Sequence, residues 1–276
     1  MVVTGVIALV VTIIVGLATE MLGDREAIAE QRNRSRDQEV RAELVALGFR
    51  SPASSALREL SMRLAASHGV EILHADVEVE LTLDNGVVTA GPAEERALAA
   101  ATVLVVDELT RLPSELLRKS GLARVMLVTR LAEERRAIPS LPNYNRSLIL
   151  DVDASPAFLR RLLHHEVFHF IDLAEDGEVL RDPAWERLNP PGFRYGSGGR
   201  TMREPAASAL SREFPGFATR YATSAIEEDK AELFAFIVTE PAALRAMARD
   251  DAYLAAKIAR LEASIAKLVP GVDIAR

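Results

Sequence analysis

Residues 160–172, RRLLHHEVFHFID, place three of the chain's five histidines within six positions. His165, Glu166 and His169 form an HExxH motif. Residues four apart on a helix share one face, so both imidazoles can bind one metal ion while Glu166 reaches a water molecule on that ion. Zinc suits this arrangement because it accepts imidazole nitrogen and carboxylate oxygen and activates water. The stretch therefore predicts a helix with a catalytic Zn²⁺ site, in which Glu166 is the general base.

The surrounding residues strengthen the helical interpretation. The alternative is a half-buried helix with two surface histidines, but the motif is flanked by apolar residues that would bury one side of it: Leu162, Leu163, Val167, Phe168 and Phe170. His164 lies about a quarter-turn from His165 and therefore off the metal face. Packing or solvent contact is its expected role.

A catalytic zinc site needs a third protein ligand. The chain has no cysteine and no histidine after His169, so a ligand from the C-terminal half must be acidic. Glu228 and Glu232 share one face of a predicted helix, and spacing alone does not choose between them. Glu232 precedes the apolar run LFAFI, where a buried carboxylate needs a partner. The acids of this helix are Glu227, Glu228, Asp229 and Glu232.

The segments HHEVFHFID and YATSAIEEDKAELFA together resemble bacterial zinc-binding metallopeptidases of the gluzincin kind, and more distantly the catalytic domain of anthrax lethal factor. The resemblance implies that His165 and His169 are zinc ligands with Glu166 as the base. It implies Glu232 as the third ligand. It also implies that Tyr221 stabilises the oxyanion of the reaction.

The resemblance extends over residues 123–248 and includes WERLNPPGFRY. It also matches Asp172, for which it implies a role beside the metal ligands or at the helix end. Tyr221 lies eleven positions before Glu232, farther than in the toxin. Tyr195 is therefore an alternative source of the hydroxyl that stabilises the oxyanion. Its other interpretation is an ordinary aromatic residue packed in a loop.

Composition limits the class of protein. The 276 residues are 49% hydrophobic but only 5% aromatic, which favours a helix-rich chain with a modest sheet. The net charge of −7 and the absence of a basic face argue against binding to nucleic acid. We expect an α+β, predominantly helical, zincin-like domain with a small β-sheet and an N-terminal membrane helix.

The N-terminal segment has no charged residue from Met1 to Thr19. A helix of this length nearly spans a bilayer, so residues 1–19 are predicted to be a single-pass membrane anchor. A cleaved signal peptide is the rival, because Gly16-Leu17-Ala18 is a small-x-small site. Arginines after the segment favour a cytoplasmic domain, whereas the family resemblance favours an extracytoplasmic one, towards which we lean.

The rest of the chain is expected to contain a charged helical stalk at residues 20–50 and a catalytic domain at 51–276. Helices are predicted at 54–69, at 92–113, from Ser155 through the motif, and as two segments at the C-terminus. A hairpin is predicted around residues 84–86 and strands at 123–129 and 146–153, with a Pro- and Asn-rich loop at 136–145.

These observations favour a zinc-dependent peptidase acting on peptide or protein substrates. We expect the strand SLILDVD, residues 147–153, to be the sheet edge against which a substrate backbone pairs. The alternatives are a membrane-tethered binding module that keeps zinc without turnover, and a hydrolase of a non-peptide amide. Glu166 favours an enzyme, because zinc binding alone does not need it.

Overall fold

The computed structural model describes residues 35–83, 86–177, 180–199 and 205–274. The chain divides into two compact units, Met1–Leu47 and Gly48–Arg276. In the first unit, residues 35–46 are helical, within the predicted stalk. The predicted membrane segment at 1–19 lies outside the described residues. None of the described helices has both the length and the apolar character needed to cross a membrane.

The second unit contains a mixed sheet centred on β5 (Arg124–Glu133). The first half of β5 is parallel to β2 (Glu71–Ala75) on one side and β8 (Ser147–Asp151) on the other. Its second half is antiparallel to β4 (Gly86–Gly91) and β6 (Arg136–Ala137). The outer strands are β1 (Phe49–Arg50) beside β2, β3 (Val79–Leu83) beside β4, and β7 (Ser140–Tyr144) beside β8.

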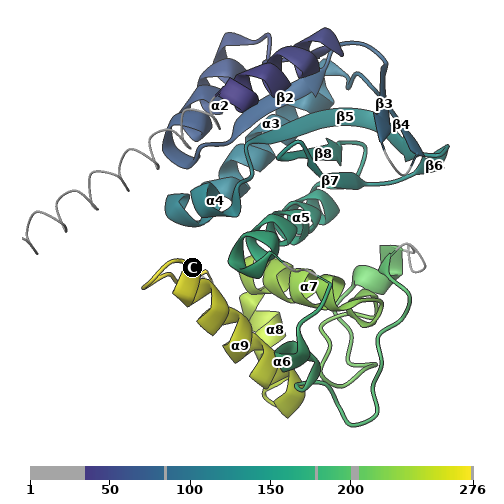
Figure 1. Ribbon diagram of the computed structural model, residues 1–276, viewed down its shortest axis with the longest axis vertical. Coiled ribbons are helices and arrows are strands. Elements are labelled where there is room, and N and C mark those ends of the chain that lie inside the picture. The colour runs from purple at the N-terminus through teal and green to yellow at the C-terminus, as the bar shows by residue number, and fades with distance from the viewer. Residues whose placement is uncertain (1–34, 84–85, 178–179, 200–204, 275–276) are drawn as a thin grey trace, which may run out of the picture. The chain divides into compact units, whose positions relative to one another are not determined.

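Helix α5 (Pro156–Asp176) occupies the centre of this unit, between the β7–β8 end of the sheet and α7 (Ile226–Thr239) (Figure 1). The helices and 3₁₀ turns around it are α2 (Ser55–His68), α3 (Glu95–Leu109), α4 (Ser114–Ser120), α6 (Pro183–Glu186), η2 (Pro205–Ser208), η3 (Tyr221–Thr223), α8 (Pro241–Ala248) and α9 (Ala252–Leu268). Helices α3 and α4 pack against α5 from the side of the sheet, and α8 and α9 pack against α7.

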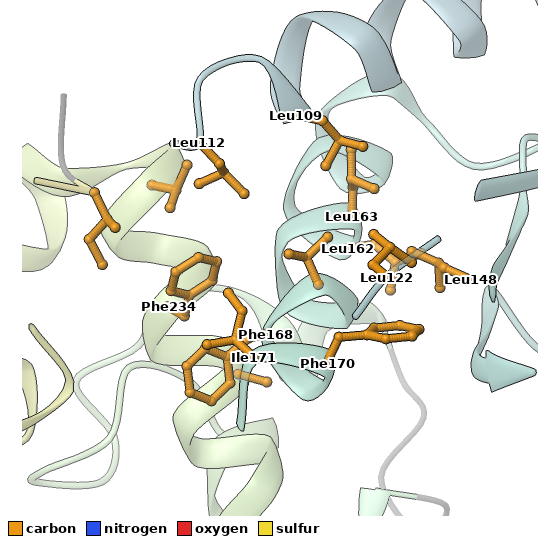
Figure 2. Close-up of a cluster of buried hydrophobic side chains, with 14 of the residues drawn as sticks. Leu109, Leu112, Leu122, Leu148, Leu162, Leu163, Phe168, Phe170, Ile171 and Phe234 are labelled. Atoms are coloured by element: carbon orange, nitrogen blue, oxygen red, sulfur yellow. The ribbon is translucent and has the colours of Figure 1, made fainter. Parts of the chain in front are cut away.

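The buried face of α5 belongs to one continuous hydrophobic core. In Figure 2, Leu163 lies beside Leu109 of α3, and Phe168 and Ile171 face Phe234 of α7. The rings of Phe168 and Phe234 are 5.2 Å apart between centroids. This burial fixes the rotation of α5, so that its polar face, which carries the HExxH motif, is held in one orientation.

Much of the predicted secondary structure is confirmed. The helix at 54–69 is α2, and Gly69 ends it in the left-handed conformation with φ of 78°. The hairpin is β3–β4, the predicted strands are β5 and β8, and Ser155 caps α5. An α+β fold is therefore observed, although the described sheet, with eight strands, is larger than expected.

Two expectations about the sheet were wrong. The predicted loop at 136–145 contains β6 and β7, because Pro139 and Pro142 favour extended backbone. β8 is not the edge strand, since it pairs with β5 on one side and β7 on the other. The edge at this end of the described sheet is β7.

Other elements were missed or merged. Strand β2 and helix α4 were not predicted, and α3 begins at Glu95 instead of in the turn at Pro92. The first of the two predicted C-terminal helices is in fact two helices, α7 and α8. Pro241 has no backbone N–H to donate to the preceding turn, so α7 ends before it and α8 begins at it.

Candidate active site

The HExxH motif lies in the middle of α5, and the flanking residues explain why. Ser155 accepts a hydrogen bond at the N-terminus of the helix, and Pro156 takes the first helical position. Gly177 ends the helix with φ of 76°. The motif lines a cavity of about 500 Å³ between α5, β7, α7 and η3.

Three atoms of the kinds that bind metal ions converge in this cavity. His165 Nε2 and His169 Nε2 are 3.3 Å apart. Glu228 Oε2 lies 3.0 Å from the first nitrogen and 3.7 Å from the second. All three atoms lie within 4.8 Å of one another. Two imidazole nitrogens and one carboxylate oxygen form the donor set of a catalytic zinc site with three protein ligands, so these residues fit the ion.

Two of these three groups are in protonation states that suit a metal. In the third, His165, burial lowers the pKa but the two carboxylates of Glu228 and Glu232 together raise it by more, so a metal ion would displace its proton. Burial alone would raise the pKa of Glu228, but the hydrogen bond and charge of His165 lower it to about 2. Burial and the neighbouring charge of His165 lower the pKa of His169 to about 4. At neutral pH Glu228 is ionised and His169 is neutral, which are the states that bind a cation.

Glu232 contacts the other nitrogen of His165. Its Oε1 lies 2.9 Å from His165 Nδ1, and the carboxylate is buried. Its second oxygen has no hydrogen-bond partner among the described residues. Glu232 is thus in the cavity wall, as the sequence suggested. The carboxylate that meets the two Nε2 atoms, however, is Glu228, one turn earlier on α7.

Glu166 points to the sheet side of the cavity. Its Oε1 accepts a hydrogen bond of 2.6 Å from Ser140 Oγ on β7. Its Oε2 is buried and has no hydrogen-bond partner among the described residues. Burial raises the pKa of Glu166, and the charge of His165 and the Ser140 hydrogen bond only partly oppose this. A carboxylate with a raised pKa is a stronger base than an ordinary carboxylate.

Tyr221 enters the cavity from η3. Its ring centroid is 5.9 Å from that of His165, and its side chain hydrogen-bonds Glu228. A Cβ atom at Gly199 would collide with the Tyr221 hydroxyl and with a Glu228 carboxylate oxygen, so any larger residue there would displace these two side chains. Burial and nearby carboxylates raise the pKa of Tyr221, which keeps its proton available for donation.

Tyr195, the alternative tyrosine, does not line the cavity. Its hydroxyl donates to Asp229 Oδ2 at 2.6 Å. The same oxygen accepts bonds from Trp185 Nε1 at 2.8 Å and Lys257 Nζ at 2.7 Å. Lys257 is fully buried on α9 and lies over the Phe217 ring. This cluster fixes α7 next to Glu228.

His164 lies off the helix face that carries His165 and His169, as predicted. It is fully buried, and its Nε2 lies 3.1 Å from Glu108 Oε2 of α3. Arg160 Nε lies 2.8 Å from the other oxygen of Glu108. His164 therefore connects α5 to α3 as a structural residue.

Asp172 lies outside the cavity, near the C-terminal end of α5. Its Oδ1 accepts a 3.0 Å hydrogen bond from Lys230 Nζ of α7, and both side chains are buried. Lys230 also lies 3.5 Å from Asp182 before α6. The contact joins α5, which carries the two histidines of the motif, to α7, which carries Glu228.

Sequence reasoning missed Ser140, Gly199 and Lys257. The prolines on either side of Ser140 were a usable signal, because proline in a strand is typical of sheet edges. No signal of comparable strength marks Gly199 or Lys257, whose partners lie far away in the sequence.

Comparison with known proteins gives few matches. No family model matches the chain, and no curated protein matches it. Among solved structures, one similar chain is a "putative zinc-binding metallo-peptidase" from Bacteroides caccae, with a TM-score of 0.49 and 17% identity over 82% of this chain and 91% of that one.

Proposed function

We propose that this protein is a zinc-dependent peptidase whose ion is held by His165, His169 and Glu228. The convergence of their three ligand atoms within 4.8 Å supports the assignment. The resemblance implied that Glu232 is the third ligand. In this proposal Glu232 instead orients His165 through its contact with Nδ1. When bound, zinc would polarise the substrate carbonyl and lower the pKa of water towards neutrality.

Glu166 is the proposed general base. Ser140 holds one of its oxygens at 2.6 Å, while the other has no hydrogen-bond partner among the described residues. The second oxygen can therefore take the proton of the attacking water. The raised pKa of Glu166 favours acceptance of that proton, which the carboxylic acid then passes to the leaving amine.

Tyr221 is the proposed hydroxyl donor to the oxygen that becomes negative during attack. Its position beside Glu228 and its place in the cavity lining support this role. A donor held in place before the reaction stabilises the developing charge without reorganising.

The edge strand β7 supports a peptide as the substrate. The Asp151 amide donates a hydrogen bond to the Pro139 carbonyl, so residues 139 and 151 are a hydrogen-bonded pair. Hydrogen-bonded and non-hydrogen-bonded pairs alternate along an antiparallel ladder, so the N–H and C=O of Ser140 point away from β8. An extended peptide can pair with that free edge, in a cavity also lined by Pro139 and Pro142. The Ser140 side chain meanwhile contacts Glu166, which places the base beside the paired backbone.

The test uses the full chain, purified and analysed for zinc by mass spectrometry. We expect one zinc per chain and cleavage of a random peptide library. Glu166→Gln should retain the zinc but lose at least about a hundredfold in rate, because general base catalysis is removed. Equal cleavage by the variant, or a zinc-free wild-type chain that cannot be loaded, would contradict the proposal.

A further inference from the structure

The cavity also contains a guanidinium group. Arg161 lies one helical turn before His165 and lines the same cavity. Its Cζ atom is 5.5 Å from the ring centroid of Phe158 and 5.2 Å from that of Phe236. Neither ring offers a carbonyl or carboxylate oxygen, so these contacts leave the N–H groups of the guanidinium available to an oxygen acceptor.

Arg161 makes no ion pair or hydrogen bond with any other described residue. The adjacent Arg160, in contrast, is bound to Glu108 at 2.8 Å. Arg161 is half-buried, so its charge is partly removed from water, and no carboxylate of the described residues offsets it. A ligand with a negative group would supply that partner.

Four of the five acidic residues of the cavity have partners other than Arg161, and the fifth is Asp153. Glu166 accepts a hydrogen bond from Ser140 Oγ. Glu228 and Glu232 contact His165. Asp151 accepts backbone hydrogen bonds from Leu131 at 2.8 Å and Asp153 at 2.9 Å. Asp153 is exposed. The positive charge of Arg161 is therefore a local feature of one end of the cavity.

The position of Arg161 relative to the metal site follows from the pairing of α5 with α7. Going back along α5 from His169 to His165 and Arg161, the contacts move forward along α7, from Glu228 to Glu232 and Phe236. The two helices therefore run antiparallel along the cavity. Four helical residues span about 6 Å, and an extended peptide advances about 3.3 Å per residue. A group bound by Arg161 would lie within about two residues of the cleaved bond.

We propose that Arg161 determines substrate specificity by binding a carboxylate of the substrate within about two residues of the cleaved bond. The carboxylate is either an acidic side chain or the C-terminus of the peptide. The proposal rests on the peptidase function above and adds the substrate class to it. The planar guanidinium binds a carboxylate through two parallel hydrogen bonds, which lysine cannot do.

The first test measures cleavage preference. Peptides of one sequence carry Glu, Gln or Lys at each of the two positions on either side of the cleaved bond, with a free or an amidated C-terminus. We expect wild-type kcat/KM to be about tenfold higher for a carboxylate than for its amide at one position. If the preference follows only the free C-terminus, the source is the terminal carboxylate; if it persists in amidated peptides, it is the side chain.

Variants then assign the preference to Arg161. Arg161→Gln should bring the ratio of Glu to Gln substrates close to one, and Arg161→Glu should favour Lys. Arg249→Gln, which removes an exposed arginine outside the cavity, should keep the wild-type ratio. A wild-type ratio of one, or an unchanged ratio in Arg161→Gln, would overturn the proposal.

A binding measurement separates this proposal from the peptidase proposal. Zinc-loaded Glu166→Gln is titrated with the Glu and Gln peptides, in the presence and absence of the Arg161→Gln change. Tighter binding of the Glu peptide that depends on Arg161 supports the specificity role even if the wild-type chain cleaves nothing, in which case only the peptidase proposal fails. Equal binding of both peptides overturns the role of Arg161.

Discussion

Glu232 Oε1 lies 2.9 Å from His165 Nδ1, on the opposite side of the ring from the nitrogen that faces His169. A carboxylate in this position fixes the tautomer and the direction of a metal-binding histidine. The same α7 helix supplies Glu228 to the Nε2 side. Two glutamates one turn apart thus hold the two nitrogens of a single imidazole.

The two glutamates should differ in their effect on zinc binding. Glu228→Ala removes a proposed ligand and should abolish stoichiometric zinc binding. Glu232→Ala should keep one zinc per chain but weaken its affinity by about 10- to 100-fold, the usual cost of losing such an orienting partner. Zinc affinity measured by competition with a chelating dye distinguishes them, and the reverse ranking would restore Glu232 as the ligand.

Tyr221→Phe should lower kcat with little change in zinc content. Loss of one donor to a developing oxyanion costs about a hundredfold or more in rate. Tyr195→Phe is the matched control, because its hydroxyl binds Asp229 outside the cavity. A larger kcat loss for Tyr195→Phe, at equal stability of the two variants, would contradict the placement of Tyr221.

Lys257→Met should destabilise the fold strongly. It leaves the buried Asp229 carboxylate without its cation, and breaking such a pair costs about 3–5 kcal/mol. Lys267→Met, at an exposed position of the same helix, should change the free energy of unfolding by less than about 0.5 kcal/mol. Urea denaturation measures the free energy of unfolding of both variants. An equally small change in the two would show that the pair of Lys257 with Asp229 adds little to stability.

Glu108 should make stability depend on pH in the acid range. Burial would raise its pKa, but the hydrogen bond from His164 and the charges of His164, Arg111 and Arg160 produce a net lowering. The carboxylate therefore contributes stability that is fully present above its ordinary pKa near 4.5 and is lost as the pH falls through the lowered value. Unfolding of Glu108→Gln should depend less on pH below 4.5 than that of the wild type, and parallel curves would exclude this contribution.

The sequence was most informative where one helix carried the whole signal. The cap at Ser155, the apolar face of α5 and the HExxH spacing all follow from local rules, and the structure shows the helix they predict. The hairpin β3–β4 and helix α2 were found for the same reason.

Local rules failed where the outcome depended on a distant partner. Glu228 and Glu232 are equivalent by spacing, and only the position of α7 against α5 shows which nitrogen each one meets. The segment of β7 was predicted to be a loop because it contains prolines. Proline is tolerated in an edge strand, but only the pairing with β8 shows that this segment is one. Lys257 belongs to a segment that the sequence predicts only as an amphipathic helix. In the structure its side chain is completely buried and paired with Asp229.

His165 and His169 on α5 are four residues apart, as are Glu228 and Glu232 on α7. The proposed zinc site therefore depends on the register between the two helices. A slip of α7 by one turn would bring Glu232 to the place of Glu228 and set Phe236 against His165. The contacts of Lys230 with Asp172 and of Lys257 with Asp229 oppose such a slip. Insertions within these helices should consequently be far less tolerated than insertions in the loops between them.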